Sequence, residues 1–333
     1  MAKRITMAHG DGGEQAHQLI QDLFVEQFAH HKEATLDAAI LTLPTEKIAM
    51  STDSFVVNPI FFPGGNIGKL AVAGTVNDIA VSGAKPLYLT CGFILEEGFL
   101  ISDLEKIVTS MVEEAQKNQV KIVAGDTKVV ERGKCDGLYI NTTGIGLIEK
   151  ENELKYDFQV GDCVLVNGNV GDHGIAILTA RGELGLMNDV QSDCASLFGF
   201  IQTLQEAGIT IRIMRDATRG GLATTLVEIC EDFSITMELD EEQIPVDDRV
   251  HGSCELLGYE PMYLANEGKC IFVVPQEQCE KALEIMKSHP LGQHASKIGE
   301  VIHTEQGRLL LKTVFGSSRR LSRLSGMLLP RIC

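Results

Sequence analysis

Four aspartates lie where predicted strands end or where glycine-rich turns follow them, at positions Asp53, Asp78, Asp126 and Asp216. Carboxylate oxygens are hard ligands that suit Mg²⁺, which commonly bridges the phosphates of a nucleotide. Aspartate is also a common residue of turns and helix N-caps, so each of the four alone is compatible with a structural role. As a set, they are candidate ligands of a Mg²⁺-nucleotide complex.

Two glycine-rich turns precede predicted helices, at residues 64–69 and 168–174. The first amides of a helix and its positive dipole end can hold an anion, so Gly65, Lys69 and Asn169 are candidate phosphate-binding residues. The Gly-x-x-x-x-Gly-Lys-Ser/Thr spacing of a Walker A loop is absent. His173, in the second turn, is interpreted as a polar turn residue rather than as a base.

The last 18 residues, Gly316–Cys333, carry four arginines and no acidic residue, in a protein of net charge −17. A thiol such as Cys333 on a mobile basic arm can enter a distant pocket, be modified there, and carry the product to a partner. At ~3.3–3.6 Å per residue such an arm reaches at most about 60 Å. An ordinary frayed terminus is the alternative interpretation.

Composition limits the class of protein. A chain of 333 residues with 44% hydrophobic residues predicts about two domains. Nine cysteines without a Cys-x-x-Cys pair favour a reduced, cytoplasmic environment over a disulfide framework or a zinc site. We expect no secretory signal and no membrane span, because the first 30 residues contain acids and no apolar run approaches ~20 residues. The acidic excess argues against nucleic acid as a partner.

Hydrophobic patterning predicts alternating strands and helices, and hence mixed α/β layers. We expect strands at 47–57, 86–95, 120–124, 138–148, 162–166, 271–274 and 309–314. We expect helices at 19–28, 67–81, 102–118, 174–181, 196–205, 221–231 and 276–287. Ser102 and Glu105 have the spacing of a capping box for the third of these helices.

The acidic, polar segment 149–159 separates two predicted strands and is the expected domain boundary. We therefore divide the chain into an N-terminal segment and helix (1–35), an N-terminal domain for ATP binding and dimerisation (36–154), a C-terminal α/β domain (155–315) and a mobile tail (316–333).

Taken in order, the motifs resemble those of a known family, the HypE carbamoyl dehydratases of hydrogenase maturation. They are Thr52-Asp53-Ser54-Phe55, Val76-Asn77-Asp78-Ile79-Ala80, Gly125-Asp126-Thr127, Asp216-Ala217-Thr218-Arg219-Gly220-Gly221-Leu222, Asn266-Glu267-Gly268 and Pro330-Arg331-Ile332-Cys333. The resemblance covers essentially the whole chain. The aspartate motifs are similar to those of a wider superfamily with aminoimidazole ribonucleotide synthetase, selenophosphate synthetase and thiamine-monophosphate kinase. The final Pro-Arg-Ile-Cys distinguishes the HypE family.

The resemblance implies a two-domain aminoimidazole ribonucleotide synthetase-like (PurM-like) fold and an ATP-dependent dehydration. A carboxamide on the Cys333 sulfur would become a thiocyanate, which supplies cyanide to the iron of [NiFe]-hydrogenase. All four aspartates would hold Mg²⁺-ATP. Glu267 is the candidate general base, since burial can raise its pKa toward neutrality. Lys128 is the candidate for orienting the carboxamide or Glu267, although a turn carboxylate and a surface lysine are the alternatives.

The same resemblance implies partners. The carbamoyltransferase HypF would deliver the carbamoyl group, and the HypC–HypD complex would receive cyanide. A homodimer is expected through apolar strand faces of the N-terminal domain that include Thr142, Thr143, Ile145 and Leu147, although these faces would also suit a monomer core.

Two rival functions remain open. A different ATP-dependent enzyme of the superfamily, such as a cyclase, would need no terminal cysteine. A non-catalytic assembly scaffold would bind no ATP.

Overall fold

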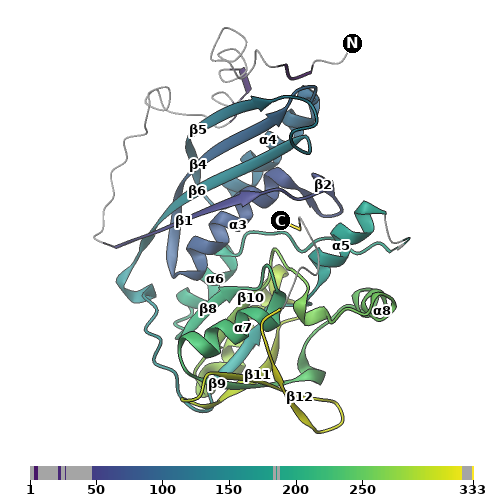
Figure 1. Cartoon of the computed structure of the whole chain (residues 1–333). Coiled ribbons are helices and arrows are strands. Elements are labelled where there is room, and N and C mark those ends of the chain that lie inside the picture. The colour runs from purple at the N-terminus through teal and green to yellow at the C-terminus, as the bar shows by residue number, and fades with distance from the viewer. Residues whose placement is uncertain are drawn as a thin grey trace.

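The computed structural model describes residues 4–6, 22–23, 27, 47–182, 185, 188–324 and 332–333. Two mixed α/β units follow each other along this part of the chain (Figure 1). The helix predicted at 19–28 falls almost wholly outside the described residues, as do Pro330 and Arg331 of the tail.

The N-terminal unit is a four-stranded sheet in the order β1-β6-β4-β5, in which β4 and β5 are parallel and the other neighbours antiparallel. Its strands are β1 (Ile48–Phe55), β4 (Ala84–Glu96), β5 (Lys121–Val130) and β6 (Leu138–Ile148). A short hairpin, β2 (Phe61–Phe62) and β3 (Gly65–Asn66), precedes the first helix. Two helices, α3 (Ile67–Val81) and α4 (Ile101–Lys117), cover one face of the sheet (Figure 1).

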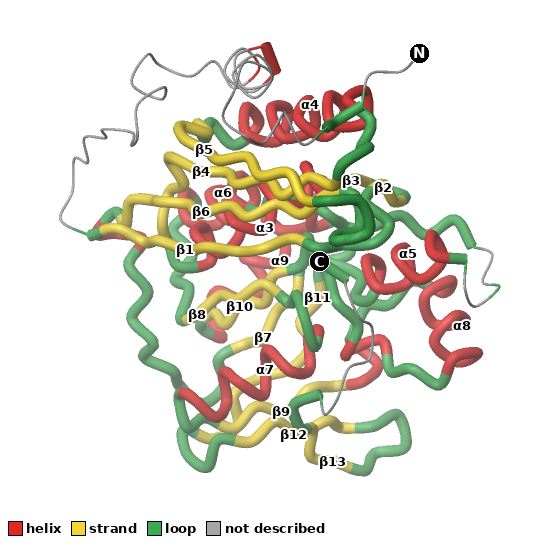
Figure 2. Tube along the Cα trace, turned by 45° about the horizontal axis from the view of Figure 1, so that its top comes forward, coloured by secondary structure: helices red, strands yellow, loops and turns green. Residues whose placement is uncertain are grey.

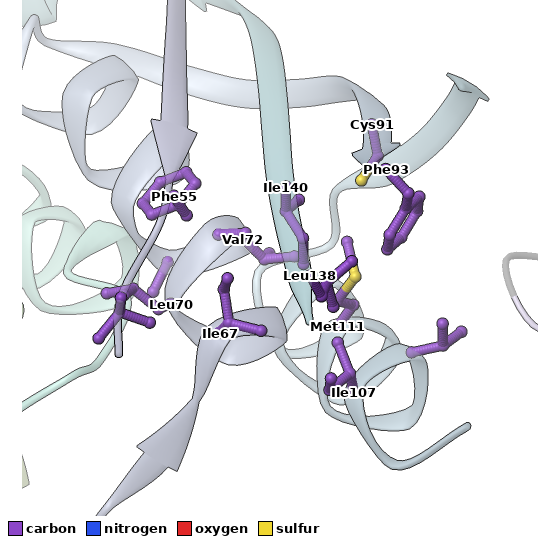
Figure 3. Close-up of a cluster of buried hydrophobic side chains, with 14 of the residues drawn as sticks. Phe55, Ile67, Leu70, Val72, Cys91, Phe93, Ile107, Met111, Leu138 and Ile140 are labelled. Atoms are coloured by element: carbon purple, nitrogen blue, oxygen red, sulfur yellow. The ribbon is translucent and has the colours of Figure 1, made fainter. Parts of the chain in front are cut away.

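Burial explains why these helices form. Helix α3 is almost entirely buried and consists largely of small and β-branched residues, which let it lie between the sheet and the C-terminal unit. Helix α4 buries one stripe that includes Leu104, Ile107 and Met111, whose spacing is that of an amphipathic helix. These side chains meet Phe55 and Ile140 of the sheet in one apolar cluster (Figure 3).

The capping box predicted at Ser102 is wrong. Helix α4 begins at Ile101, after Leu100, and no side chain caps it. Asp103 lies in the first turn, where the helix dipole favours an acid. The helix start therefore lacks the reciprocal bonds that the sequence spacing indicated.

The C-terminal unit is a seven-stranded sheet in the order β13-β12-β9-β11-β7-β10-β8. Its strands are β7 (Cys163–Val166), β8 (Ile213–Asp216), β9 (Thr236–Asp240), β10 (Cys270–Val274), β11 (Ser296–His303), β12 (Arg308–Lys312) and β13 (Ser318–Leu321). The helices are α5 (Asp172–Arg181), α6 (Phe198–Glu206), α7 (Gly221–Asp232), α8 (Asp248–Leu257) and α9 (Cys279–Ser288). Apolar clusters join α6 and α9 to one face of the sheet and α7 to the other.

The mixed α/β class is confirmed, but several elements were not predicted. Hydrophobic patterning did not predict β8, β9, α8 or β11, and it predicted the last strand at 309–314, whereas β12 spans Arg308–Lys312. The structure adds β13, antiparallel to β12, inside the segment predicted as a mobile tail. The two described residues at the chain end, Ile332 and Cys333, lie between the two units (Figures 1 and 2).

All nine cysteines are free thiols, and seven of them are buried. The buried thiols pack as small apolar residues. Within the described ranges, no helix combines the length and the apolar character needed to cross a bilayer.

Candidate active site

The end of the chain is held at the junction of the two units. The main-chain N–H of Val56, just after β1, donates to the main-chain oxygen of Cys333 at 3.0 Å. The side chain of Ile332 is buried in the apolar cluster of the N-terminal unit, and Cys333 packs against that cluster. The thiol of Cys333 is thereby brought into the interior of the molecule rather than left on an extended arm.

The carboxylate of Glu267 interacts electrostatically with this thiol. It lies in the turn before β10, and its side chain is buried with Oε1 lacking a hydrogen-bond partner. The carboxylate of Asp193 accepts from the backbone N–H groups of Glu267 and Gly268, at 3.0 and 3.1 Å. Gly268 is required because a Cβ there would lie 2.0 Å from the backbone oxygen of Asp193. The turn is thus fixed in a shape that points a carboxyl group inward.

The electrostatics of Glu267 suit a base. Burial, followed by the negative charges of Asp193, Asp216, Asp53 and Asp78, holds the pKa of Glu267 well above its ordinary value. The direction expected from the sequence is confirmed. Burial and then the charge of Glu267 also raise the pKa of the Cys333 thiol, to about 12, so the thiol in this position is neutral.

Three of the four predicted aspartates converge here from different elements. Asp53 is on β1, Asp78 is on α3, and Asp216 ends β8. Burial and then the charge of Asp78 raise the pKa of Asp216 to about 7, and burial raises the pKa of both Asp53 and Asp78. Ser51 Oγ donates to Asp78 Oδ2 at 2.6 Å. Burial, and for Asp78 and Asp216 the charges of neighbouring carboxylates, therefore favour the protonated forms of these groups.

Positive charge faces this edge from the C-terminal unit. Arg219 lowers the pKa of Asp53 and of Cys333, although burial outweighs it in both, and Arg215 does the same for Asp78 and Asp216. In the part of the chain that the structure describes, no three His, Cys, Asp or Glu side chains are close enough to hold a metal ion by themselves.

Asp126 is not brought to this edge within one chain. It aligns with Gly92 on β4 and with the exposed Asn141 on β6, on the sheet face that carries no helices. Asp53 aligns instead with Thr142, whose hydroxyl is buried against α3. Asp126 and Asp53 thus belong to opposite faces, and the three strand spacings between their strands amount to about 14 Å.

Lys128 shares the position of Asp126. Its Nζ forms an exposed pair with Asp126 at 2.8 Å, and both side chains are about two-thirds exposed. Lys128 belongs to the helix-free sheet face, so in one chain it orients neither Glu267 nor a group on Cys333.

His173 was interpreted from the sequence as a polar turn residue, but the structure buries it completely. One ring nitrogen, Nε2, lies 2.7 Å from the carbonyl oxygen of Ile332, and the other, Nδ1, lies 2.8 Å from Ser192 Oγ. The ring also meets Phe62 edge-on, with centroids 5.6 Å apart. His173 therefore contacts the tail directly, which no local sequence pattern could indicate.

Comparisons with known proteins agree with this geometry. Residues 35–148 match the AIR synthase related protein N-terminal domain, and residues 159–312 match the corresponding C-terminal domain. The carbamoyl dehydratase HypE of Azotobacter vinelandii is 46% identical, covering 99% of this chain and 97% of that relative. The HypE of Escherichia coli strain K12 is also 46% identical, covering 99% of each. This chain belongs to the HypE family of carbamoyl dehydratases.

Solved structures of HypE share the fold as well. A HypE crystallised in complex with ATP matches with a TM-score of 0.93 and 46% identity, covering 98% of this chain and 99% of that one. The HypE of a HypE–HypF complex matches with a TM-score of 0.80 and 47% identity, covering 92% of this chain and 99% of that one. The PurM-like two-domain fold expected from the sequence is therefore confirmed.

The candidate phosphate-binding residues of the two glycine-rich turns do not lie beside Glu267 and Cys333 in this HypE-family chain. Lys69 and Asn169 line a pocket of about 560 Å³ between the two units. Ser192 and Asp193 also line this pocket, and Ser192 contacts His173, which contacts the tail. The start of α3 is already occupied, because Asn66 Oδ1 accepts from the N–H groups of Gly68 and Lys69 at 2.9 and 3.1 Å. Those two amides are not free for a phosphate. Gly65 lies in β3, in the hairpin before this helix.

Proposed function

We propose that this chain uses ATP to dehydrate a carboxamide on the sulfur of Cys333, giving a thiocyanate. The observation that supports this most strongly is that Cys333 shares a buried site with Glu267, whose raised pKa suits a base and whose Oε1 has no partner. A turn carboxylate with a merely structural role would satisfy both of its oxygens.

The reaction needs two events at one carboxamide. Its oxygen attacks the γ-phosphorus of ATP, ADP leaves, and the nitrogen loses one proton, which gives an isourea-like O-phosphate. Glu267 then accepts the remaining N–H proton, the carbon–oxygen bond breaks, phosphate leaves, and the carbon–nitrogen triple bond forms. The elements of one water end in phosphate, so the balance is S-carboxamide plus ATP to thiocyanate, ADP, phosphate and a proton.

The converging aspartates would bind the nucleotide through Mg²⁺. When bound, the metal neutralises charge that develops on the transferred phosphoryl group. Asp53, Asp78 and Asp216 supply carboxylate oxygens of the type that Mg²⁺ prefers, and a cation would stabilise the ionised forms that burial disfavours. The ATP complex of a 46% identical HypE supports ATP as the nucleotide.

A homodimer would bring Asp126 and Lys128 to the same site. The helix-free face of the N-terminal sheet exposes Ile48, Met50 and Ile94, apolar side chains that a second copy can cover. The edge strands of this sheet are β1 and β5, so packing two such faces about a two-fold axis parallel to the strands would place β5 of one chain beside β1 of the other. Asp126 and Lys128 on β5 would then approach the β1 edge of the second copy, where Asp53 lies on the opposite face of the strand.

The partners follow from the chemistry. Cys333 must receive a carbamoyl group and pass on cyanide, and both exchanges require it to leave the interior. The solved HypE–HypF complex supports HypF as the donor. The HypC–HypD complex would be the acceptor, and the cyanide would serve the iron of [NiFe]-hydrogenase.

Intact mass analysis of the tail peptide tests the proposal. After incubation with HypF, carbamoyl phosphate and Mg²⁺-ATP, we expect Cys333 to carry a carboxamide that then loses the mass of one water. The variant Cys333→Ala should remain folded and unmodified. Stoichiometric carbamoylation of another cysteine in that variant, or a carboxamide that persists with ATP present, would overturn the proposal.

A further inference from the structure

The segment that carries Cys333 is held by side chains that none of the expected catalytic roles uses. We infer that His173, oriented by Ser192, and the backbone of Val56 form a binding seat for the Ile332-Cys333 end of the tail. In this seat His173 is a positioning residue that fixes the sulfur beside Glu267. The binding of the tail end needs no ATP, so only the role assigned to the seat rests on the proposed function.

The hydrogen-bond pattern defines one state of His173. The carbonyl oxygen of Ile332 can only accept, so Nε2 of His173 donates to it. Complete burial lowers the pKa of His173 and favours the neutral ring, so Nδ1 accepts from Ser192 Oγ. The same Ser192 Oγ accepts from the N–H of Cys194 at 3.0 Å. Every polar atom in this chain of contacts has a partner of the correct kind, which is the condition for a buried polar network to be stabilising.

The seat recognises both the backbone and a side chain. Val56 donates to the main-chain oxygen of Cys333, and His173 donates to that of Ile332. The Ile332 side chain is 4% exposed within an apolar cluster that also contains Cys194 and Ile177. The ligand class is therefore a peptide segment with an aliphatic residue directly before cysteine. A charged residue at 332 would be buried without a partner.

The seat is separate from the contacts that hold the start of the tail. Tyr263 Oη donates to the Ser322 carbonyl at 2.9 Å, and Arg323 pairs with Glu231 at 2.7 Å. These contacts are exposed, and exposed ion pairs contribute little. They involve α7 and its surroundings and none of the residues that contact Ile332 and Cys333.

The rate at which Cys333 is alkylated in the full-length protein measures how well the seat holds the tail. The reaction is monitored by the mass of the tail peptide, so that other thiols do not interfere. We expect His173→Leu to raise the alkylation rate about tenfold, since it removes a donor and leaves a buried carbonyl unpaired. His173→Gln keeps an N–H donor at the end of its side chain and should restore part of the protection. Ile332→Asp should raise the rate by at least as much as His173→Leu, without altering the walls of the seat.

His289→Leu is the matched control, because His289 also packs edge-on against a phenylalanine, Phe200, and forms no hydrogen bond or ring contact with the described residues of the tail. It should leave the alkylation rate of Cys333 unchanged. Equal rates in the wild-type protein, His173→Leu and Ile332→Asp would overturn the seat, as would equal effects of His173→Leu and His289→Leu. The alkylation assay contains no nucleotide, so it tests the seat separately from the proposed function. If Cys333 is protected in this assay but forms no nitrile when HypF, carbamoyl phosphate and Mg²⁺-ATP are added, the proposed function is refuted and the seat is retained.

Discussion

The two edges of the N-terminal sheet differ in what they assemble. Along β1, one chain gathers Asp53, Asp78, Asp216, Glu267 and Cys333 into a site with strongly shifted pKa values. Along β5, Asp126 and Lys128 form only an exposed ion pair with each other. In the proposed function, one chain supplies the candidate base and the sulfur carrier, whereas the residues on β5 would need a second copy to reach them.

Replacing the base should have the largest effect. Glu267→Gln removes the proton acceptor but keeps the shape of the turn, which is set by the backbone bonds to Asp193. We expect nitrile formation to fall by about 10²–10⁴-fold. ATP binding should persist, as calorimetry would show. Dehydration at a near-normal rate would remove Glu267 from the mechanism and leave the β1 edge without a base.

The buried carboxyl group of Asp216 should make the free energy of unfolding depend on pH. Because the pKa of Asp216 is raised from 3.8 to about 7, the folded state holds a proton that the unfolded state releases. Without Mg²⁺, stability should therefore decline as pH rises from about 4 to about 7. Asp216→Asn should remove most of this decline and stabilise the metal-free protein at pH 7 by about 2 kcal/mol. Urea denaturation at several pH values measures this, and a slope equal to that of the wild-type protein would contradict the electrostatic account.

A smaller effect should connect nucleotide to the tail. Mg²⁺-ATP next to Cys333 can favour the seated state only by contacting it better than the released state. We expect alkylation of Cys333 to slow about threefold at saturating Mg²⁺-ATP and to recover when nucleotide is removed. Identical rates with and without nucleotide would show that the seat and the nucleotide site are uncoupled.

Much of the fold was predictable because local patterns determine it. The buried run of α3 and the alternation of β6 gave both elements with their observed bounds, 67–81 and 138–148. Strand β9 and helix α8 were missed because their segments are short and rich in charge, and α8 buries only Val250, Ser253 and Cys254. Tertiary packing, rather than propensity, decides such elements.

The candidate site divides in the same way. Glu267 and Asp216 could be selected because their motifs lie in a turn and at a strand end, whereas Asp53 lies within β1 and Asp78 within α3. His173 could not be assigned a role, because its partner Ile332 is 159 positions away in sequence. The placement of Asp126 and Lys128 could not be derived either, since the sheet face on which a residue lies depends on strand pairing and register. The arginines of the tail partly pair with the acidic body, as Arg319 does with Glu260.

A mixing experiment tests the comparison of the two edges most directly. The variants Glu267→Gln and Lys128→Ala are each prepared as full-length protein, assayed alone, then mixed under conditions that exchange subunits and assayed again for conversion of the carboxamide to the nitrile. If each site takes Glu267 from one chain and Lys128 from the other, random exchange leaves about a quarter of the sites intact, and activity should recover to about that fraction of the wild-type value. Activity that stays at the level of the separate variants, although mass measurements show mixed dimers, would contradict a site shared between two copies.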